Sequence, residues 1–132
     1  MIVLDASAAV EFVLGTPIGQ DVRDRLGADP PQAPHLIDAE VTQVLRRFVF
    51  AGTLTADRGR EALDDFTALR VFRYPHGPLL HRVWELRDNS TAYDAMYLAL
   101  AEALDAPLLT TDARLATVPA HRAVVEILPP PT

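Results

Sequence analysis

Four acidic residues, far apart in the chain, are candidates for metal-assisted chemistry. Asp5 and Asp112 each follow a short apolar run that predicts a buried strand. Glu40 and Asp94 each lie near the start of a long helical pattern, on its apolar side. A buried carboxylate needs a partner, and four carboxylates that share one pocket need a cation. These residues therefore predict a metal enzyme.

An α/β fold would bring the four side chains to one place. In an open parallel sheet, ligands bind beyond the carboxyl ends of the strands, where the strand order reverses. Asp5 and Asp112 stand at such ends and would meet there if the first and fourth strands are neighbours. Glu40 and Asp94 are spaced three or four residues from apolar residues of their helices, so each lies along a buried stripe.

The residue types favour Mg²⁺, with Mn²⁺ as the alternative. Two carboxylates about 4 Å apart repel each other by about 4 kcal/mol at an effective dielectric constant of about 20, and a divalent cation removes that penalty. The chain has no cysteine and its four histidines are scattered, which leaves oxygen ligands. Such a site activates water and neutralises charge at a phosphoryl group. We therefore expect phosphodiester hydrolysis, with Ser7, Thr91 and Thr111 available to orient ligands or water.

Each acid also has a purely structural explanation. Asp112 could cap a short helix, and Asp94 could complete a capping box that begins at Thr91. Asp5 could cap a turn, and Glu40 could extend to solvent. Together these explanations are weaker than the metal site, because all four positions fall at one end of one predicted sheet.

Composition excludes several other chemistries. All 12 basic residues are arginine, and the missing lysine excludes Walker-type phosphate loops, Schiff bases and the lysine of receiver domains. The net charge of −6 argues against a protein that coats nucleic acid. Residues 46–88 nevertheless carry eight arginines against six acids. This stretch could steer a phosphate backbone toward the site, or could simply be a set of solvated helix faces.

The pattern of apolar residues predicts one domain, residues 1–128, followed by a proline-rich tail, residues 129–132. No apolar run approaches the ~20 residues of a membrane span, and the chain opens with a strand rather than a signal region, so we expect a cytoplasmic protein without membrane contact. Predicted strands alternate with predicted helices, which implies a parallel sheet between two helical layers. The expected strands are 1–5, 33–35, 71–74, 107–111 and 123–128. The expected helices are 8–14 (capped by Ser7), 17–27, 36–51, 55–69, 78–88, 91–104 and 112–117.

Four strings in the chain carry a family resemblance. They are Met1-Ile-Val-Leu-Asp-Ala-Ser-Ala, Asp38-Ala-Glu-Val, Thr91-Ala-Tyr-Asp-Ala-Met-Tyr-Leu-Ala and Leu109-Thr-Thr-Asp-Ala-Arg-Leu. In order and spacing they resemble the PIN-domain ribonucleases, and more narrowly the VapC-type toxins of bacterial toxin–antitoxin pairs. The string around Asp94 is the most specific of the four.

The resemblance implies a three-layer α/β/α sandwich whose five-stranded parallel sheet has the order 3-2-1-4-5. It implies a Mg²⁺-dependent endoribonuclease that cuts structured RNA, forms a homodimer and is silenced by a cognate antitoxin covering the active site. The family's acidic quartet maps onto Asp5, Glu40, Asp94 and Asp112. Asp5, Asp94 and Asp112 would hold the metal, while Glu40 would bind it through water or accept a proton.

Other functions remain open from the sequence. A Mg²⁺-dependent phosphatase of the aspartyl-phosphate type wants a second aspartate two residues after the first, where Ser7 stands. A non-catalytic receiver-like module needs a lysine that the chain lacks, and a degenerate PIN-like scaffold would not need an intact quartet. Arg46-Arg47 could contact RNA phosphate or an antitoxin. Tyr93, Tyr97 and Trp84 could stack on bases, or could pack in the core or a dimer.

Overall fold

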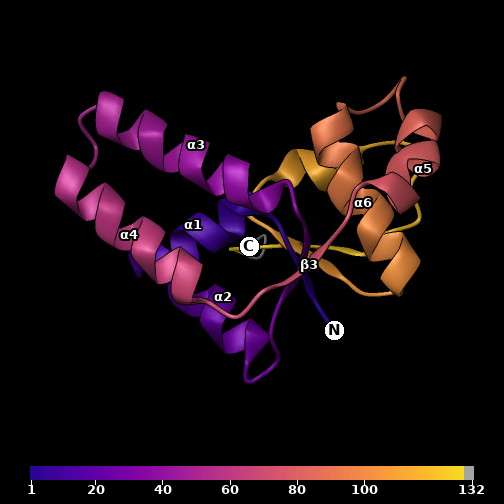
Figure 1. Cartoon of the computed structure of the whole chain (residues 1–132). Coiled ribbons are helices and arrows are strands. Elements are labelled where there is room, and N and C mark those ends of the chain that lie inside the picture. The colour runs from indigo at the N-terminus through magenta and orange to yellow at the C-terminus, as the bar shows by residue number, and fades with distance from the viewer. Residues whose placement is uncertain (130–132) are drawn as a thin grey trace.

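Five short parallel strands form the centre of the computed structural model, which describes residues 1–129 (Figure 1). Their order is β3-β2-β1-β4-β5, as predicted, so β1 and β4 are neighbours. The strands are β1 (Val3–Leu4), β2 (Gln32–Pro34), β3 (Phe72–Tyr74), β4 (Leu108–Thr110) and β5 (Val125–Ile127).

Helices cover both faces of the sheet. Figure 1 shows one group of helices on each side of the strands. The first group is α1 (Ala6–Leu14), α2 (Pro17–Leu26), α3 (Ile37–Phe50) and α4 (Ala56–Ala68). The second group is α5 (Leu80–Glu85) and α6 (Ala92–Leu104), with short 3₁₀ helices η1 (Gly77–Leu79) and η2 (Ala113–Thr117). The predicted three-layer α/β fold is therefore confirmed.

Strand β1, in the middle of the sheet, is buried on both faces, as its unbroken apolar sequence predicts. Ile2 and Leu4 pack in the core under α1 to α4, whereas Val3 packs in the core under α6. The same division appears in β4, where Leu109 faces the first core and Leu108 the second. Because both strands are held from two sides, the residues at their carboxyl ends have fixed positions.

The helix starts differ from the prediction in one place that matters for the site. Asp5, not Ser7, caps α1, and its Oδ1 accepts a hydrogen bond from the N–H of Ala8 at 3.0 Å. The reason is that β1 ends at Leu4, so Asp5 is the last residue with extended backbone and Ser7 falls inside the first turn. The predicted helix 78–88 is also shorter, since η1 and α5 together end at Glu85.

The predictions about membrane contact and about the C-terminal tail concern the whole length of the chain. No helix among residues 1–129 is long and apolar enough to cross a lipid bilayer. The domain boundary at residue 128 stays a prediction, and residues 130–132 of the proposed tail lie outside the described part of the chain.

Close contact between α1 and α2 gives a test of the packing. A Cβ placed on Gly19 would lie 2.0 Å from the carbonyl oxygen of Glu11, a backbone atom that cannot move aside. We expect Gly19→Ala to lower the free energy of unfolding by about 3 kcal/mol, measured by chemical denaturation. Gly77→Ala is the control, because its Cβ would meet no atom within 4 Å. Equal stability of the two variants would contradict this packing.

Candidate active site

All four predicted acids line one hollow at the carboxyl ends of β1 and β4. Its volume is about 290 Å³, and it contains Asp5, Glu40, Asp94 and Asp112. Asp5 comes from the end of β1 and Asp112 from the segment after β4, while Glu40 comes from α3 and Asp94 from α6. The structure thus brings together side chains from the sheet and from both helical layers.

Asp5 is the most buried of these acids, with 6% of its surface exposed. Its Oδ1 accepts hydrogen bonds from the hydroxyl of Ser7 at 2.7 Å and from the N–H of Ala8 at 3.0 Å. Its Oδ2 accepts a hydrogen bond from the hydroxyl of Thr110 at 2.5 Å. Both oxygens are therefore held by the first turn of α1 and the last residue of β4.

Thr110 connects Asp5 to Asp112. While its hydroxyl donates to Asp5, the same oxygen accepts a hydrogen bond from the N–H of Asp112 at 2.9 Å. The next residue is fixed in the same way, since the N–H of Thr111 donates to Ser7 Oγ at 3.1 Å. The turn after β4 is thereby attached to the first turn of α1, which sets the distance between the two aspartates.

The two helical acids are also positioned. The hydroxyl of Tyr97, on α6, donates to Glu40 Oε1, on α3, at 2.7 Å. Asp94 lies in the first turn of α6, where Thr91 caps the helix by accepting from the N–H of Asp94 at 3.2 Å. Of the two roles considered for Thr91, orienting a ligand or capping the helix, the structure shows the cap. One turn of α6 separates Asp94 from Tyr97, so both face the hollow.

Arg114 supplies positive charge at the edge of the hollow. Its Nη2 lies 2.6 Å from Asp112 Oδ2 and 4.0 Å from Asp94 Oδ2. Its Nε donates to both oxygens of Asp112, at 3.1 and 3.2 Å. The guanidinium side chain is 79% exposed, so it covers these two carboxylates from the solvent side.

The pKa values show that the carboxylates differ in their environments. Burial raises the pKa of Asp5 from 3.8 to about 6, and the charge of Asp112 adds to the effect. Burial also raises the pKa values of Glu40 and Asp94. The pKa of Asp112 is lowered instead, chiefly by its hydrogen bond with Arg114. The ionised forms of Asp5, Glu40 and Asp94 are therefore disfavoured in the hollow unless a cation is bound.

The donor set suits a hard divalent cation. Within residues 1–129, no three acidic or histidine side chains lie close enough together to enclose a metal ion without adjustment. The four acids nevertheless offer only oxygen donors, and the pKa values of three of them would fall if a cation were bound. The residues therefore fit Mg²⁺ or Mn²⁺ by charge and donor type, and their assignment as ligands remains a prediction.

Sequence reasoning missed three residues of the site: Thr110, Tyr97 as a partner of Glu40, and Arg114. Thr110 could have been found, because it stands two residues before Asp112, and residues two apart in an extended segment lie on the same side of the chain. Tyr97 follows Asp94 by three residues on one helix face. No sequence signal indicates that Arg114 turns back toward Asp112. Tyr93 and Trp84 are 62% and 66% exposed, so they do not belong to the core.

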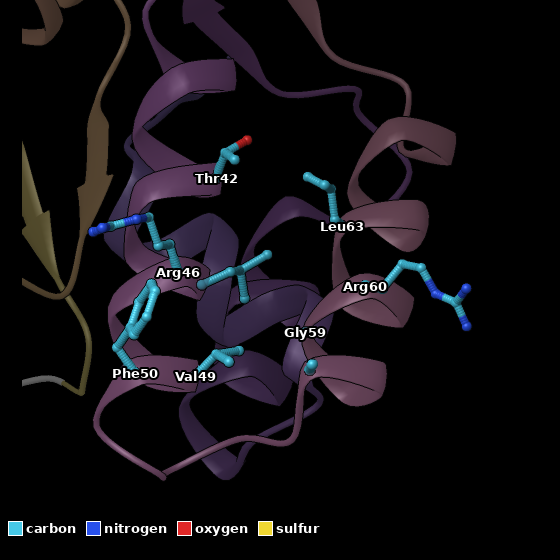
Figure 2. A pocket seen from close by; sticks show the side chains of 9 residues that line it. Thr42, Arg46, Val49, Phe50, Gly59, Arg60 and Leu63 are labelled. Carbon is cyan, nitrogen blue, oxygen red and sulfur yellow. The ribbon is translucent and has the colours of Figure 1, made fainter.

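A second hollow lies between α3 and α4, on the other side of α3 (Figure 2). Its volume is about 260 Å³, and apolar side chains such as Leu45, Val49 and Leu63 line it. Figure 2 shows Val49 on α3 between the two helices, opposite Gly59 and Leu63 on α4, with Phe50 at the outer edge of α3 beside Arg46. Phe50 is 77% exposed. We call this second hollow the α3–α4 groove.

Comparisons with known proteins agree on one family. The PIN domain model matches residues 2–120. Ribonuclease VapC1 of Mycobacterium tuberculosis is 47% identical over 119 residues, which cover 89% of this chain and 90% of that protein. Ribonuclease VapC9 of the same organism is 43% identical over 129 residues, covering 98% and 99%. The solved structure of VapBC2 from Rickettsia felis, bound to a DNA fragment from their promoter, has a TM-score of 0.70 at 16% identity and covers 96% of this chain and 98% of that one. This last likeness shows the fold.

The raised pKa of Asp5 gives a stability test in the absence of metal. The folded protein holds the Asp5 proton up to a pH of about 6, whereas the unfolded chain releases it near 3.8. Between these values the unfolded state binds fewer protons, so rising pH lowers the free energy of unfolding, by about 3 kcal/mol for this group. Asp5→Asn should lack this decrease when unfolding is followed in EDTA from pH 4 to 7.

The exposed Asp24, on α2, provides the matched control for this measurement. Asp24→Asn removes the same charge outside the hollow and should leave the pH dependence as in the wild type. If Asp5→Asn and the wild type lose stability in parallel as the pH rises, Asp5 is not the buried charge described above.

Proposed function

This chain belongs to the PIN domain family, and from that premise we propose that it is a Mg²⁺-dependent endoribonuclease, the toxin of a toxin–antitoxin pair. The observation that carries the proposal is the convergence of four carboxylates in one hollow at the ends of β1 and β4. Relatives named Ribonuclease VapC support RNA as the substrate, rather than the phosphomonoester of a phosphatase or the partner of a non-catalytic module. Structured RNA is the substrate class that the family resemblance favours.

The metal would be held by Asp5, Asp94 and Asp112. When bound, Mg²⁺ would supply the charge that stabilises a phosphoryl group under attack and would activate the attacking water. Mn²⁺ prefers similar oxygen ligands and is the expected substitute. The hydrogen bonds from Ser7, Ala8 and Thr110 leave Asp5 little freedom, so its contribution to the ligand set is preorganised.

Glu40 is suited to a different task. Burial raises its pKa, which makes its carboxylate a better proton acceptor near neutral pH. Tyr97 donates to Oε1, which fixes the carboxylate and leaves Oε2 available to accept a proton. We therefore assign proton acceptance, or a contact to the metal through water, to Glu40.

Cleavage assays test the catalytic proposal. We expect Asp94→Asn to cut RNA about 100-fold more slowly than the wild type, since loss of a metal ligand removes about 3 kcal/mol of transition-state stabilisation. EDTA should stop the wild type, and added Mg²⁺ should restore it. Asp24→Asn, exposed on α2, should cut at the wild-type rate. Cleavage that persists in EDTA, or that Asp94→Asn leaves intact, would contradict a metal-dependent mechanism at this site.

We further propose that the antitoxin occupies the α3–α4 groove and extends to the acidic hollow. Support comes from α3, which lines both the groove and the acidic hollow. Leu45 and Arg46 line the groove. Val44 and Arg47 line the acidic hollow. An amphipathic segment could bury its apolar face between α3 and α4. Acidic residues along it would pair with Arg46 and Arg60 at the groove edges. The likeness to a VapBC2 structure agrees with such a partner.

Phe50 tests this assignment because it lies in the groove and is exposed, so its replacement should not unfold the chain. We expect Phe50→Asp to weaken antitoxin binding by about tenfold or more while RNA cleavage continues at the wild-type rate. Val124→Asp is the control, since Val124 is 67% exposed and lies after η2, outside the groove. If Phe50→Asp binds the antitoxin with unchanged affinity, the antitoxin does not occupy the groove. If Phe50→Asp instead changes the oligomeric state, the groove is covered by a second copy of the chain.

The homodimer and the cytoplasmic location remain proposals. Leu80 and Trp84 stand one turn apart on α5 and are 51% and 66% exposed. They form an apolar strip of the kind that a second copy of the chain would cover.

A further inference from the structure

Arg114 stands where a cation would be needed. It follows Asp112 by two residues, and its own N–H donates to Asp112 Oδ1 at 3.0 Å, which fixes the backbone beside the carboxylate. The side chain then turns back, so that Nη2 reaches Asp112 Oδ2 at 2.6 Å and comes within 4.0 Å of Asp94 Oδ2. Both oxygens of Asp112 are therefore engaged by one residue.

A divalent cation could not bind Asp112 and Asp94 without moving this guanidinium. The lone pairs that a metal ion needs on Asp112 are those that Arg114 occupies. The two cations would also repel each other at close range. Arg114 is free to leave, because its side chain is 79% exposed and exposed ion pairs add little to stability.

A phosphate of the RNA is a suitable second partner for the displaced guanidinium of Arg114. RNA brings phosphates to a hollow lined by four carboxylates, on a chain whose net charge is −6. Positive groups beside the hollow must offset this repulsion. Arg47, exposed on α3, lines the hollow as Arg114 does, but comes from a different element. A guanidinium binds phosphate through two parallel hydrogen bonds, as it binds a carboxylate.

We propose that Arg114 is an exchangeable counter-ion: it pairs with Asp112 and Asp94 until a divalent cation displaces it, and it then binds a phosphate of the RNA. Arg47 binds RNA phosphate whether or not the metal is present. This inference rests on the proposed function and adds to it an order of events, in which the cation prepares the site for the polyanion. It also assigns two phosphate-binding residues outside the acidic quartet.

The first experiment measures metal binding without RNA. Mn²⁺ is titrated into the wild type and into Arg114→Gln, and free Mn²⁺ is followed by electron paramagnetic resonance. Removal of the competing guanidinium should tighten Mn²⁺ binding by up to about fivefold, which corresponds to the ion pair that the metal no longer has to break. Arg46→Gln is the matched control: Arg46 is a neighbour of Arg47 on α3, but its guanidinium lies over the Phe50 ring at 4.6 Å, beside the groove. The Arg46→Gln variant should bind Mn²⁺ with the wild-type affinity.

The second experiment measures RNA binding against salt concentration. Unfractionated transfer RNA serves as the probe, with Ca²⁺ in place of Mg²⁺, and the slope of log affinity against log salt counts phosphate contacts. Arg114→Gln should reduce the slope by about 0.7 to 0.9 in Ca²⁺ but not in EDTA, because Arg114 is released only by the cation. Arg47→Gln should reduce the slope both in Ca²⁺ and in EDTA. Arg46→Gln should leave the slope unchanged in either condition.

The outcomes separate this inference from the proposed function. Equal or weaker Mn²⁺ binding by Arg114→Gln would show that Arg114 only supports Asp112, and would overturn the counter-ion role. An identical salt slope for Arg114→Gln and wild type in Ca²⁺ would overturn the phosphate role. If the wild type itself binds no Mn²⁺, the metal-dependent function fails together with the inference. Wild-type Mn²⁺ binding with unaltered variants refutes the inference alone.

Discussion

The buried charge of Asp5 is the constraint on which the rest of the site depends. A carboxylate with 6% of its surface exposed is unfavourable in the folded protein, and its pKa rises to about 6 as a result. Three donors offset that cost: the hydroxyls of Ser7 and Thr110 and the N–H of Ala8. They belong to the start of α1 and the end of β4. The interactions that make the charge tolerable are therefore the ones that align the two central strands with the first helix.

The order of the strands makes this arrangement possible, and the helical layers complete it. Leu4 pairs with Leu109 in the parallel register of β1 and β4, which sets Asp5 beside Thr110. Glu40 belongs to the layer of α1 to α4, whereas Asp94 and Tyr97 belong to α6 on the opposite face. The hydrogen bond from Tyr97 to Glu40 thus connects the two layers beyond the edge of the sheet. The hollow is the place where both layers extend past the strands.

The residues that sequence analysis identified are those marked by periodicity or by strand ends. Short apolar runs locate Asp5 and Asp112, and helical stripes locate Glu40 and Asp94, because burial leaves a repeating pattern. The strand order, by contrast, is predicted by the family resemblance and not by these patterns. The partners of these acids leave no such pattern: Thr110 reaches a residue 105 positions away, and Tyr97 one 57 positions away. Such contacts depend on register and side-chain rotamer. The sequence pattern predicts Ser7 as the cap of α1, whereas Asp5 caps it. Only one residue separates the end of β1 from the start of α1, and sequence patterns do not resolve so short a boundary.

Helix α3 separates two surfaces with different chemistry. Arg46 and Arg47 are adjacent in sequence, yet about 100° of helical rotation directs them to different hollows, one apolar and one acidic. A partner seated in the apolar groove and a polyanion seated over the carboxylates would therefore engage different arginines of the same helix. Their competition would arise only where the partner extends past α3 to the acids. On this geometry, affinity for the partner and access to the site are set by separate faces of one helix, so each can change by substitution without the other.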